Sequence, residues 1–526
     1  MKEKKWKRQI VLFVAFIIQY ITAFSQITPT RLKEYVLKNK DIGKAEIKYI
    51  PEVRTYYSLL NYTDSWLRRE NISITAYLLN ILSLSPNLGL EEKDYQYNFI
   101  ESYRKGTIQL LNLEDSIMAE IKLTDAAIHF FSDVVYGNTK PILEYNGLSY
   151  IPSCKNIPAM LANYLIKNKF SKLLTDLSLA QPEVPVLQKK IEWFTKIKLE
   201  KGFKEVIIKL DKIKNNTKLV IPKLYQLGII DSIYVNIHDS ILTEKIKEAQ
   251  RLFNITEDGI VGKSTIQELN IPIAARLKQL NLSINYYRWL SCLSQYSEII
   301  VVNIPASYLK VYNNNKVMLE MKVIVGKKST PTHAVASKVN EVILYPYWHV
   351  PYSIATKELL PLIQKNPGYI DANNYQVMNN KGEIMDPYKI KWNTFNQNNF
   401  PYLIRQSTGC DNALGLLKLN FYNPFGAYLH DTPTKTLFKL NKRFLSHGCI
   451  RMEKPIEIGH LILKNNQIAI DTLEQKGCLR NQSPISIPAD VQMPVIIWYN
   501  PAGMDSTGRL IFFSDVYKKL NWIKRK

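Results

Sequence analysis

The chain has 526 residues, which is too long for one ordinary hydrophobic core, so we expect about two to four domains. Hydrophobic residues make up 46% of it, with 32 Tyr, 18 Phe and 8 Trp, and this excludes a largely disordered chain. The net charge of +23 comes mostly from scattered lysines, which favours an anionic polymer or surface as partner.

The N-terminal segment has the pattern of a secretory signal peptide. Residues 2–8 include five basic side chains, and residues 10–21 are almost all apolar. Ala23-Phe24-Ser25 is a small-x-small cleavage pattern, and the apolar run is short for a membrane span. We expect residues 1–25 to direct export, with an uncleaved N-terminal anchor as the alternative. Export argues against nucleic acid as the partner and for association with the envelope surface.

Residues 26–212 read as an all-α scaffold domain. Apolar residues recur there at spacings of three and four, and Gly and Pro separate the periodic segments. His129 lies on an apolar helix, and we expect it to be a core or surface histidine with satisfied hydrogen bonds. No catalytic group is expected in this region.

Residues 213–272 contain two short helical segments around a tight turn at Glu257-Asp258-Gly259. Ser264 or Thr265 is expected to cap the second helix. The stretch resembles the three-helix peptidoglycan-binding module, and the residues that carry the resemblance are Gln250, Phe253, Asp258, Gly259, Ile260, Val261, Gly262, Thr265 and Leu269. A helical subdomain that binds nothing is the alternative. Residues 273–297 are interpreted as a linker.

Residues 298–480 read as a mainly-β domain. Two alternating runs flank Asn313-Asn314-Asn315, which is a hairpin signal. Residues 354–405 are a helix followed by an Asn-rich polar stretch, and we interpret them as an insertion between strands. Residues 481–526 are expected to form a C-terminal strand extension.

The five cysteines are scattered, odd in number and contain no Cys-x-x-Cys pair. We therefore expect neither a disulfide framework in so large a chain nor a zinc site. At least one thiol must stay unpaired, and an unpaired cysteine near histidines in an exported protein points to catalysis.

That cysteine is Cys449. His430 ends a predicted strand, fifteen residues follow, and then comes Ser446-His447-Gly448-Cys449-Ile450-Arg451. An imidazole beside the thiol is expected to take its proton and leave a thiolate–imidazolium pair with a lowered thiol pKa. Gly448 allows close backbone approach, and the N–H groups of Gly448 and Cys449 are candidates to hold an oxyanion.

This constellation resembles the signature of the L,D-transpeptidases with a YkuD-type catalytic domain. Pro346-Tyr347-Trp348, Pro367-Gly368-Tyr369 and Leu414-Gly415 with Lys418 are similar to the large Gram-negative subgroup. In that subgroup a helical scaffold, a peptidoglycan-binding-like module and a catalytic domain with a capping insertion occur in one chain. The resemblance implies a periplasmic multidomain α + β protein.

The resemblance implies a two-step acyl transfer without metal or cofactor. Cys449 would attack the carbonyl of the third residue of a peptidoglycan tetrapeptide stem and release D-alanine. An amine of a second stem would resolve the thioester to a 3→3 cross-link, and carbapenem-type β-lactams would acylate Cys449. His430 is favoured as the base, and His447 is the alternative.

Four further residues are candidates for substrate binding. Ser446 is expected to fix the loop by hydrogen bonding. Arg451 faces either a stem carboxylate or a structural salt-bridge partner. Tyr428 and Trp348 either line the donor cleft or belong to the core.

Three alternatives stay open. An L,D-carboxypeptidase would use the same thioester and resolve it with water. A non-catalytic peptidoglycan-binding scaffold would use the helical half and the basic surface. A papain-like peptidase is disfavoured, because the cysteine follows the histidine and the domain reads as β.

Overall fold

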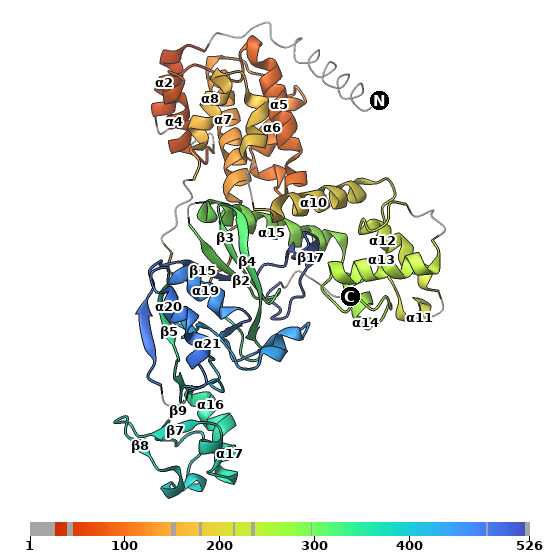
Figure 1. Cartoon of the computed structure of the whole chain (residues 1–526). Coiled ribbons are helices and arrows are strands. Elements are labelled where there is room, and N and C mark those ends of the chain that lie inside the picture. The colour runs from red at the N-terminus through yellow and green to blue at the C-terminus, as the bar shows by residue number, and fades with distance from the viewer. Residues whose placement is uncertain are drawn as a thin grey trace.

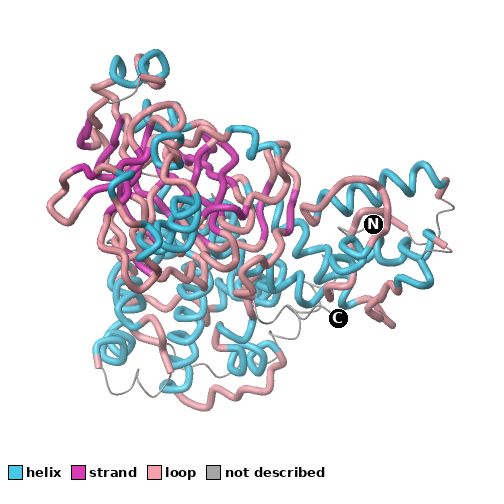
Figure 2. The backbone as a smooth tube through the Cα atoms, turned by 90° about the horizontal axis from the view of Figure 1, so that it is seen from below, coloured by secondary structure: helices cyan, strands magenta, loops and turns pink. Residues whose placement is uncertain are grey.

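The computed structural model describes residues 27–38, 46–148, 154–177, 181–213, 216–232, 237–295, 297–479 and 482–520. The predicted signal peptide, residues 1–25, lies outside them. The chain is a multidomain α + β protein with helices in its first half and most strands in its second (Figures 1 and 2). None of the helices in the described ranges is long and apolar enough to cross a bilayer.

The N-terminal lobe is a helical bundle, drawn red to yellow in Figure 1. Its α-helices are α2 (Pro29–Leu37), α4 (Ile50–Leu59), α5 (Ile72–Ser83), α6 (Tyr97–Arg104), α7 (Leu113–Tyr136), α8 (Ile157–Ile166) and α9 (Phe170–Leu177). Helix α7 forms the centre because eighteen of its 24 residues are buried. His129 on α7 is buried, with Nε2 2.8 Å from Lys48 Nζ and 3.3 Å from a carboxylate oxygen of Asp133, so this nitrogen has polar partners in the core.

A second helical lobe carries the turn of the peptidoglycan-binding-like pattern (Figure 1). Its helices are α11 (Leu210–Ile213), α12 (Ile221–Gln226), α13 (Asp239–Leu252) and α14 (Lys263–Leu269). The buried Gln250 amide donates to Asp258 Oδ1 at 2.7 Å and accepts from Gly259 N at 2.8 Å. The Gln250 side chain therefore stabilises the turn at Asp258 and Gly259. The predicted cap is wrong, because α14 begins after Gly262 and no side chain caps it.

Residues interpreted as a linker instead form a long helix, α15 (Ile273–Ser294), most of which is buried. It packs on α7 and on α10 (Glu183–Leu199). Asn285 on α15 donates to Gly89 O at 3.0 Å and accepts from Asn138 N at 3.1 Å. Ser283 accepts from Ala502 N at 3.0 Å on the other side. The helix therefore connects the N-terminal bundle to the β-domain as a rigid element.

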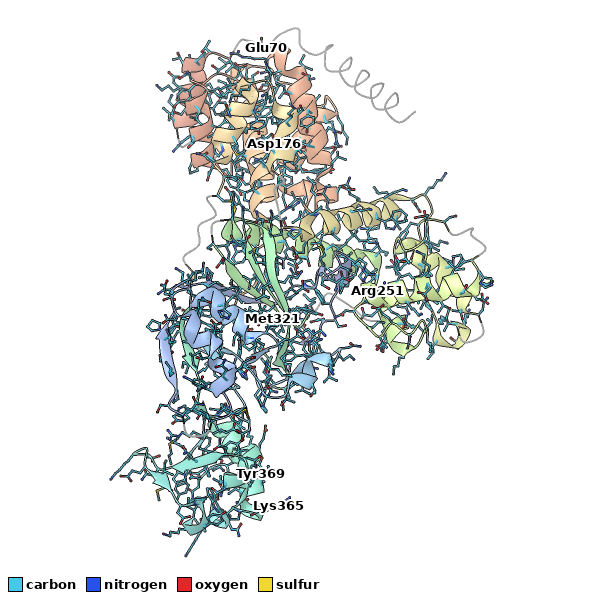
Figure 3. All side chains as sticks on the ribbon, in the orientation of Figure 1. Glu70, Asp176, Arg251, Met321, Lys365 and Tyr369 are labelled. Atoms are coloured by element: carbon cyan, nitrogen blue, oxygen red, sulfur yellow. A yellow bond between two sulfur atoms is a disulfide. The ribbon has the colours of Figure 1, made fainter. Side chains whose placement is uncertain are left out.

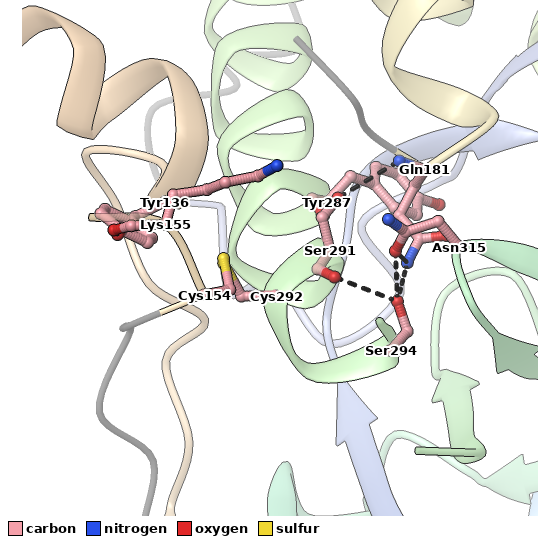
Figure 4. Close-up of a disulfide and its surroundings, with 9 residues drawn as sticks. All are labelled: Tyr136, Cys154, Lys155, Gln181, Tyr287, Ser291, Cys292, Ser294 and Asn315. Atoms are coloured by element: carbon pink, nitrogen blue, oxygen red, sulfur yellow. Dashed lines mark hydrogen bonds between the residues drawn. A yellow bond between two sulfur atoms is a disulfide. The ribbon is translucent and has the colours of Figure 1, made fainter. Parts of the chain in front are cut away.

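The expectation that the chain has no disulfide framework is wrong. Cys154 is bonded to Cys292 of α15, and Cys410 is bonded to Cys478, so Cys449 is the free cysteine. Figure 4 shows the first bond between the loop before α8 and helix α15. The two pairs are 138 and 68 residues apart in sequence, and such long-range pairing is invisible in cysteine spacing.

The β-domain is built on one large sheet that closes on itself. Its strands are β1 (Tyr145–Asn146), β2 (Ile299–Asn303), β3 (Tyr308–Asn313), β4 (Lys316–Gly326), β5 (Val335–Leu344), β10 (Leu417–Phe421), β11 (Leu429–His430), β12 (Phe444–Ser446), β13 (Ile450–Met452), β14 (Ile485–Pro488) and β15 (Pro494–Trp498). The order is β1-β5-β10-β11-β13-β4-β3-β2-β15, and β15 also pairs with β5, which gives a barrel-like sheet.

A tight turn, three helices and short strands complete the β-domain around this sheet. Asn314 and Asn315 both have positive φ, so the predicted hairpin turns tightly between β3 and β4. Helices α19 (Pro455–Ile462), α20 (Gln467–Asp471) and α21 (Leu473–Lys476) follow β13, and Ile458, Ile462 and Leu473 join the sheet core. Strand β1, from the region interpreted as all-α, pairs with β5 of the β-domain. A separate hairpin of β16 (Ala502–Met504) and β17 (Leu510–Phe512) follows β15 in the predicted C-terminal extension.

The insertion forms a small unit at one end of the molecule, where Figure 3 labels Lys365 and Tyr369. Its elements are β6 (Trp348–His349), α16 (Tyr352–Ile354), the π-helical turn η5 (Ala355–Leu359), α17 (Leu360–Lys365), α18 (Tyr369–Ala372), β7 (Tyr375–Met378), β8 (Ile384–Met385) and β9 (Leu403–Gln406). Four of them form a sheet in the order β6-β9-β7-β8 over a core that includes Leu359, Ile363 and Trp392. Because β6 belongs to it, the unit begins before residue 354.

Candidate active site

Three neighbouring strands place the candidate residues in one row. Lys418 on β10 is paired with His430 on β11, and His430 is paired with Arg451 on β13. Successive side chains on a strand point to opposite faces, so these three share a face. The opposite face holds Leu417, Leu419, Leu429 and Ile450, which are buried in the sheet core. Apolar residues on one face of the sheet thus pack each strand into the core, while the polar side chains lie on the opposite face.

Cys449 directly precedes β13 and lies in a short loop. Hydrogen bonds from the neighbouring Ser446 hold this loop in place. Ser446 Oγ donates to Cys449 O at 2.6 Å and accepts from Gly448 N at 3.2 Å. Gly448 has φ +119°, a conformation that residues with a side chain rarely adopt. Because the N–H of Gly448 already donates to Ser446 Oγ, it is not available to donate to an oxyanion. Within the described ranges, no hydrogen bond engages the N–H of Cys449, so this group is the better oxyanion donor.

Tyr428 and Trp348 form a hydrogen-bonded chain to the sulfur. The Tyr428 hydroxyl is hydrogen-bonded to both Trp348 and Cys449, and the backbone N–H of Tyr428 also reaches the sulfur. An indole N–H only donates, so the phenol must accept from Trp348 and donate its own proton toward Cys449. Trp348 comes from β6 of the insertion, so both aromatic residues belong to the site rather than to the core.

The His430 side chain is buried, and one of its two ring nitrogens is hydrogen-bonded to the backbone. Its Nδ1 lies 2.5 Å from the backbone oxygen of Asp431, which only accepts, so Nδ1 carries the proton and Nε2 keeps its lone pair. Burial, followed by the charge of Arg451, lowers the pKa of His430 to about 3, although hydrogen bonds to the carbonyls of Asp431 and Leu414 act against this. The imidazole is therefore neutral at physiological pH and has the tautomer of a general base.

The predicted thiolate–imidazolium pair is disfavoured in the resting site. Burial raises the pKa of Cys449, and the hydrogen bonds of Tyr428 and the charges of Lys418 and Arg451 only partly offset it. With His430 neutral, the resting state is a neutral thiol and a neutral imidazole. The sequence pattern named the two groups but not their desolvation, which depends on the surrounding fold.

His447 points toward the insertion. Its Nε2 lies 2.7 Å from Glu358 Oε1 on η5, and both side chains are substantially exposed. Asp431 accepts from Leu416 N at 2.9 Å and from Lys435 Nζ at 2.5 Å, so its carboxylate does not contact His430. These contacts favour His430 over His447 as the base.

Arg451 forms no ion pair with any residue in the described ranges, and its buried Nε has no hydrogen-bond partner. Burial lowers the pKa of this guanidinium while the nearby Cys449 opposes the shift. A structural salt bridge is therefore not its role here, and a guanidinium without a partner beside the nucleophile is suited to an anionic group of a ligand.

Sequence reasoning missed Glu358 and also Thr332, whose hydroxyl donates to Gly448 O at 2.8 Å in the catalytic loop. It gave Lys418 no role. Thr332 and Glu358 lie in regions without a motif and 117 and 91 residues before Cys449, so only the fold reveals them. Lys418 had a signal, because it is the single charged residue in the alternating run Leu417-Lys418-Leu419-Asn420-Phe421.

Three regions of the chain match family models of known proteins. Residues 297–470 match the family model of the L,D-transpeptidase catalytic domain, YkuD. The chain carries a YkuD-type L,D-transpeptidase domain. Residues 51–190 match a scaffold domain and residues 222–269 a peptidoglycan-binding domain.

A protein of Haemophilus influenzae named as an L,D-transpeptidase is 34% identical over 259 residues, which cover 48% of this chain and 52% of that protein. The chain thus spans about half the length of this relative. An L,D-transpeptidase from Mycobacterium smegmatis is 13% identical over 38% of this chain and 58% of that one, with a TM-score of 0.18. Another, in complex with imipenem, is 15% identical over the same shares, with a TM-score of 0.18. A TM-score this low carries no information on function.

Proposed function

We propose that this L,D-transpeptidase domain forms 3→3 cross-links in peptidoglycan through a thioester on Cys449. The observation that carries the proposal is the free Cys449 thiol under the Tyr428 hydroxyl, on the same sheet face as a neutral His430 whose Nδ1 is occupied. A nucleophile, a base with a free nitrogen and a backbone oxyanion donor are the parts that acyl transfer requires.

In the first step the sulfur of Cys449 attacks the carbonyl carbon of the third residue of a tetrapeptide stem. The thiol proton passes to His430, and the N–H of Cys449 stabilises the oxyanion. His430 then returns the proton to the amine of D-alanine, the C–N bond breaks and the thioester remains. In the second step an amine of another stem attacks the thioester carbonyl, so that a C–N bond forms and the C–S bond breaks. The proton lost by the amine passes through His430 to the sulfur of Cys449.

Arg451 and Trp348 bind the donor stem in this proposal. Arg451 offers its unpaired guanidinium to a stem carboxylate, and Trp348 forms part of the cleft wall from the insertion. The peptidoglycan-binding domain would hold the polymer near the site. Carbapenem-type β-lactams would acylate the same sulfur.

We also propose that the protein acts in the periplasm. Two disulfides support an oxidising compartment, and the N-terminal pattern supports export with or without a retained anchor.

The test is to incubate the protein with a purified disaccharide-tetrapeptide and to measure product masses. A dimer less one D-alanine is expected. A tripeptide monomer alone would make the protein an L,D-carboxypeptidase, and no product from wild-type protein would leave a peptidoglycan-binding role. Cys449→Ala should abolish both products, and turnover by that variant would overturn the proposal.

A further inference from the structure

Lys418 is a lysine in an unusual position. It lies on β10 between the core residues Leu417 and Leu419, and it is only partly exposed. Its Nζ lies 4.2 Å from the centre of the Tyr428 ring, which is a close cation–π contact. The hydroxyl of the same ring is hydrogen-bonded to the sulfur of Cys449. One aromatic ring thus connects the ammonium to the nucleophile.

Burial lowers the pKa of the Lys418 ammonium, and the nearby charges of Cys449 and Glu341 oppose this shift. Glu341 on β5 is the acidic group that acts on it, and the Glu341 carboxylate is already hydrogen-bonded to Asn420 and Ser486. The other titratable groups facing it are Cys449 and His349 of β6, with Arg451 and His430 in the same row.

We propose that Lys418 is a positioning residue for the nucleophile, whose ammonium polarises the Tyr428 hydroxyl and stabilises the Cys449 thiolate. This rests on the proposed function of Cys449 as the nucleophile. When the S–H bond breaks, the proton goes to neutral His430 and the negative charge forms on sulfur. Lys418 stays protonated throughout, so it exchanges no proton and contributes only its fixed charge.

The need for such a charge follows from the state of His430. In a thiolate–imidazolium pair the imidazolium itself stabilises the sulfur in the resting site. Here the imidazole is neutral until the proton transfers, so fixed cations must supply that stabilisation. An ammonium against a ring face also withdraws electron density from the phenol, which makes its O–H a stronger hydrogen-bond donor to sulfur.

The test is the pH dependence of Cys449 alkylation by iodoacetamide, a neutral probe, followed by intact mass. In Lys418→Met the midpoint should rise by about one pH unit, so alkylation below the midpoint should slow about tenfold. Lys418→Arg should keep the midpoint within about 0.3 units of wild type, because it keeps the charge and the ring contact. Thermal unfolding of each variant identifies any variant that does not fold.

Lys338→Met is the matched control, because Lys338 is an exposed lysine of β5 and its loss changes the net charge equally. Its profile should match that of wild type. Superimposable profiles for folded Lys418→Met and wild type would overturn the role of Lys418, as would an equal shift in the control. Alkylation needs no peptidoglycan, so its result is independent of the cross-linking assay. The proposed role of Lys418 can therefore fail while the proposed function holds, and the reverse is also possible.

Discussion

Glu358 of the insertion holds His447, two residues before the nucleophile, at 2.7 Å between Oε1 and Nε2. The contact joins the π-helical turn η5 to the loop whose backbone carries Cys449. Trp348 of the same unit reaches Tyr428. The insertion therefore contacts the site at two points, and the catalytic loop is one of them.

Glu358→Gln should loosen this connection. The Glu358 side chain is 50% exposed, so solvent screens the pair and its loss should cost about 0.2–1 kcal/mol. Hydrogen exchange of η5 and the Ser446–Cys449 loop should accelerate together by up to about fivefold. Glu383→Gln is the control, because this exposed glutamate of the same unit contacts Asn379 and not the loop. Acceleration of η5 without the loop would contradict the connection.

Thr332 controls the orientation of the peptide between Gly448 and Cys449. Its buried hydroxyl donates to Gly448 O at 2.8 Å and accepts from Gly326 N at 2.9 Å. In a trans peptide the C=O and N–H point in opposite directions. Holding Gly448 O therefore directs the N–H of Cys449 toward the opposite side, where the oxyanion is proposed to form.

Thr332→Val keeps the shape of the side chain and removes both hydrogen bonds. We expect the rate of thioester formation to fall about ten- to a hundredfold, because the donor loses its fixed direction. Alkylation of Cys449 should change little, since that reaction forms no oxyanion. Thr332→Ser should retain most of the rate. A parallel loss of both reactivities in Thr332→Val would indicate a general collapse of the loop instead.

Local periodicity predicted much of the fold. The helical N-terminal region, the hairpin at Asn314 and Asn315 and the strand that ends at His430 follow from apolar spacing and turn residues. Helix α15 was missed because it is buried on several sides, so polar and apolar residues do not separate onto two faces. The disulfides were missed because pairing depends on the folded positions of cysteines that are 138 and 68 residues apart in sequence.

The candidate site was predictable only where a motif exists. Cys449, His430 and Ser446 lie within one short stretch, and the pattern named them. Their protonation states were not predictable, because desolvation depends on the whole surrounding fold. Thr332 and Glu358 reach the loop from distant segments as single side chains, and a spacing rule does not detect such contacts.

The cysteine arrangement predicts a definite count of reactive thiols. Wild-type protein denatured without reductant should take up one iodoacetamide, at Cys449, and reduced protein should take up five. Reduction should also lower the free energy of unfolding by about 2–4 kcal/mol for each bond. Peptide mapping by mass spectrometry identifies the modified residue. Three or more adducts without reductant would contradict the pairing of Cys154 with Cys292 and of Cys410 with Cys478.

The neutral His430 predicts an unusual pH profile for acylation. A base must be unprotonated to act, so a histidine with an ordinary pKa of about 6.5 would lose most of its activity by pH 5. Because burial lowers the pKa of His430 to about 3, its neutral form persists at pH 5. The rate of acylation by a carbapenem, measured in single turnover, should therefore stay within about twofold between pH 5 and 7.5.

Arg451→Met isolates the part of this pKa shift that the charge of Arg451 causes, since burial is the larger cause. Since the positive charge of Arg451 disfavours a second positive charge on His430, its removal should raise the pKa of the imidazole. The variant should then lose acylation rate at pH 5 relative to pH 7 more than wild type does, whatever its absolute rate. A wild-type rate that falls about tenfold from pH 7 to 5, with the same midpoint in Arg451→Met, would show that an ordinary imidazolium controls the reaction. The resting site would then hold the ion pair that burial disfavours.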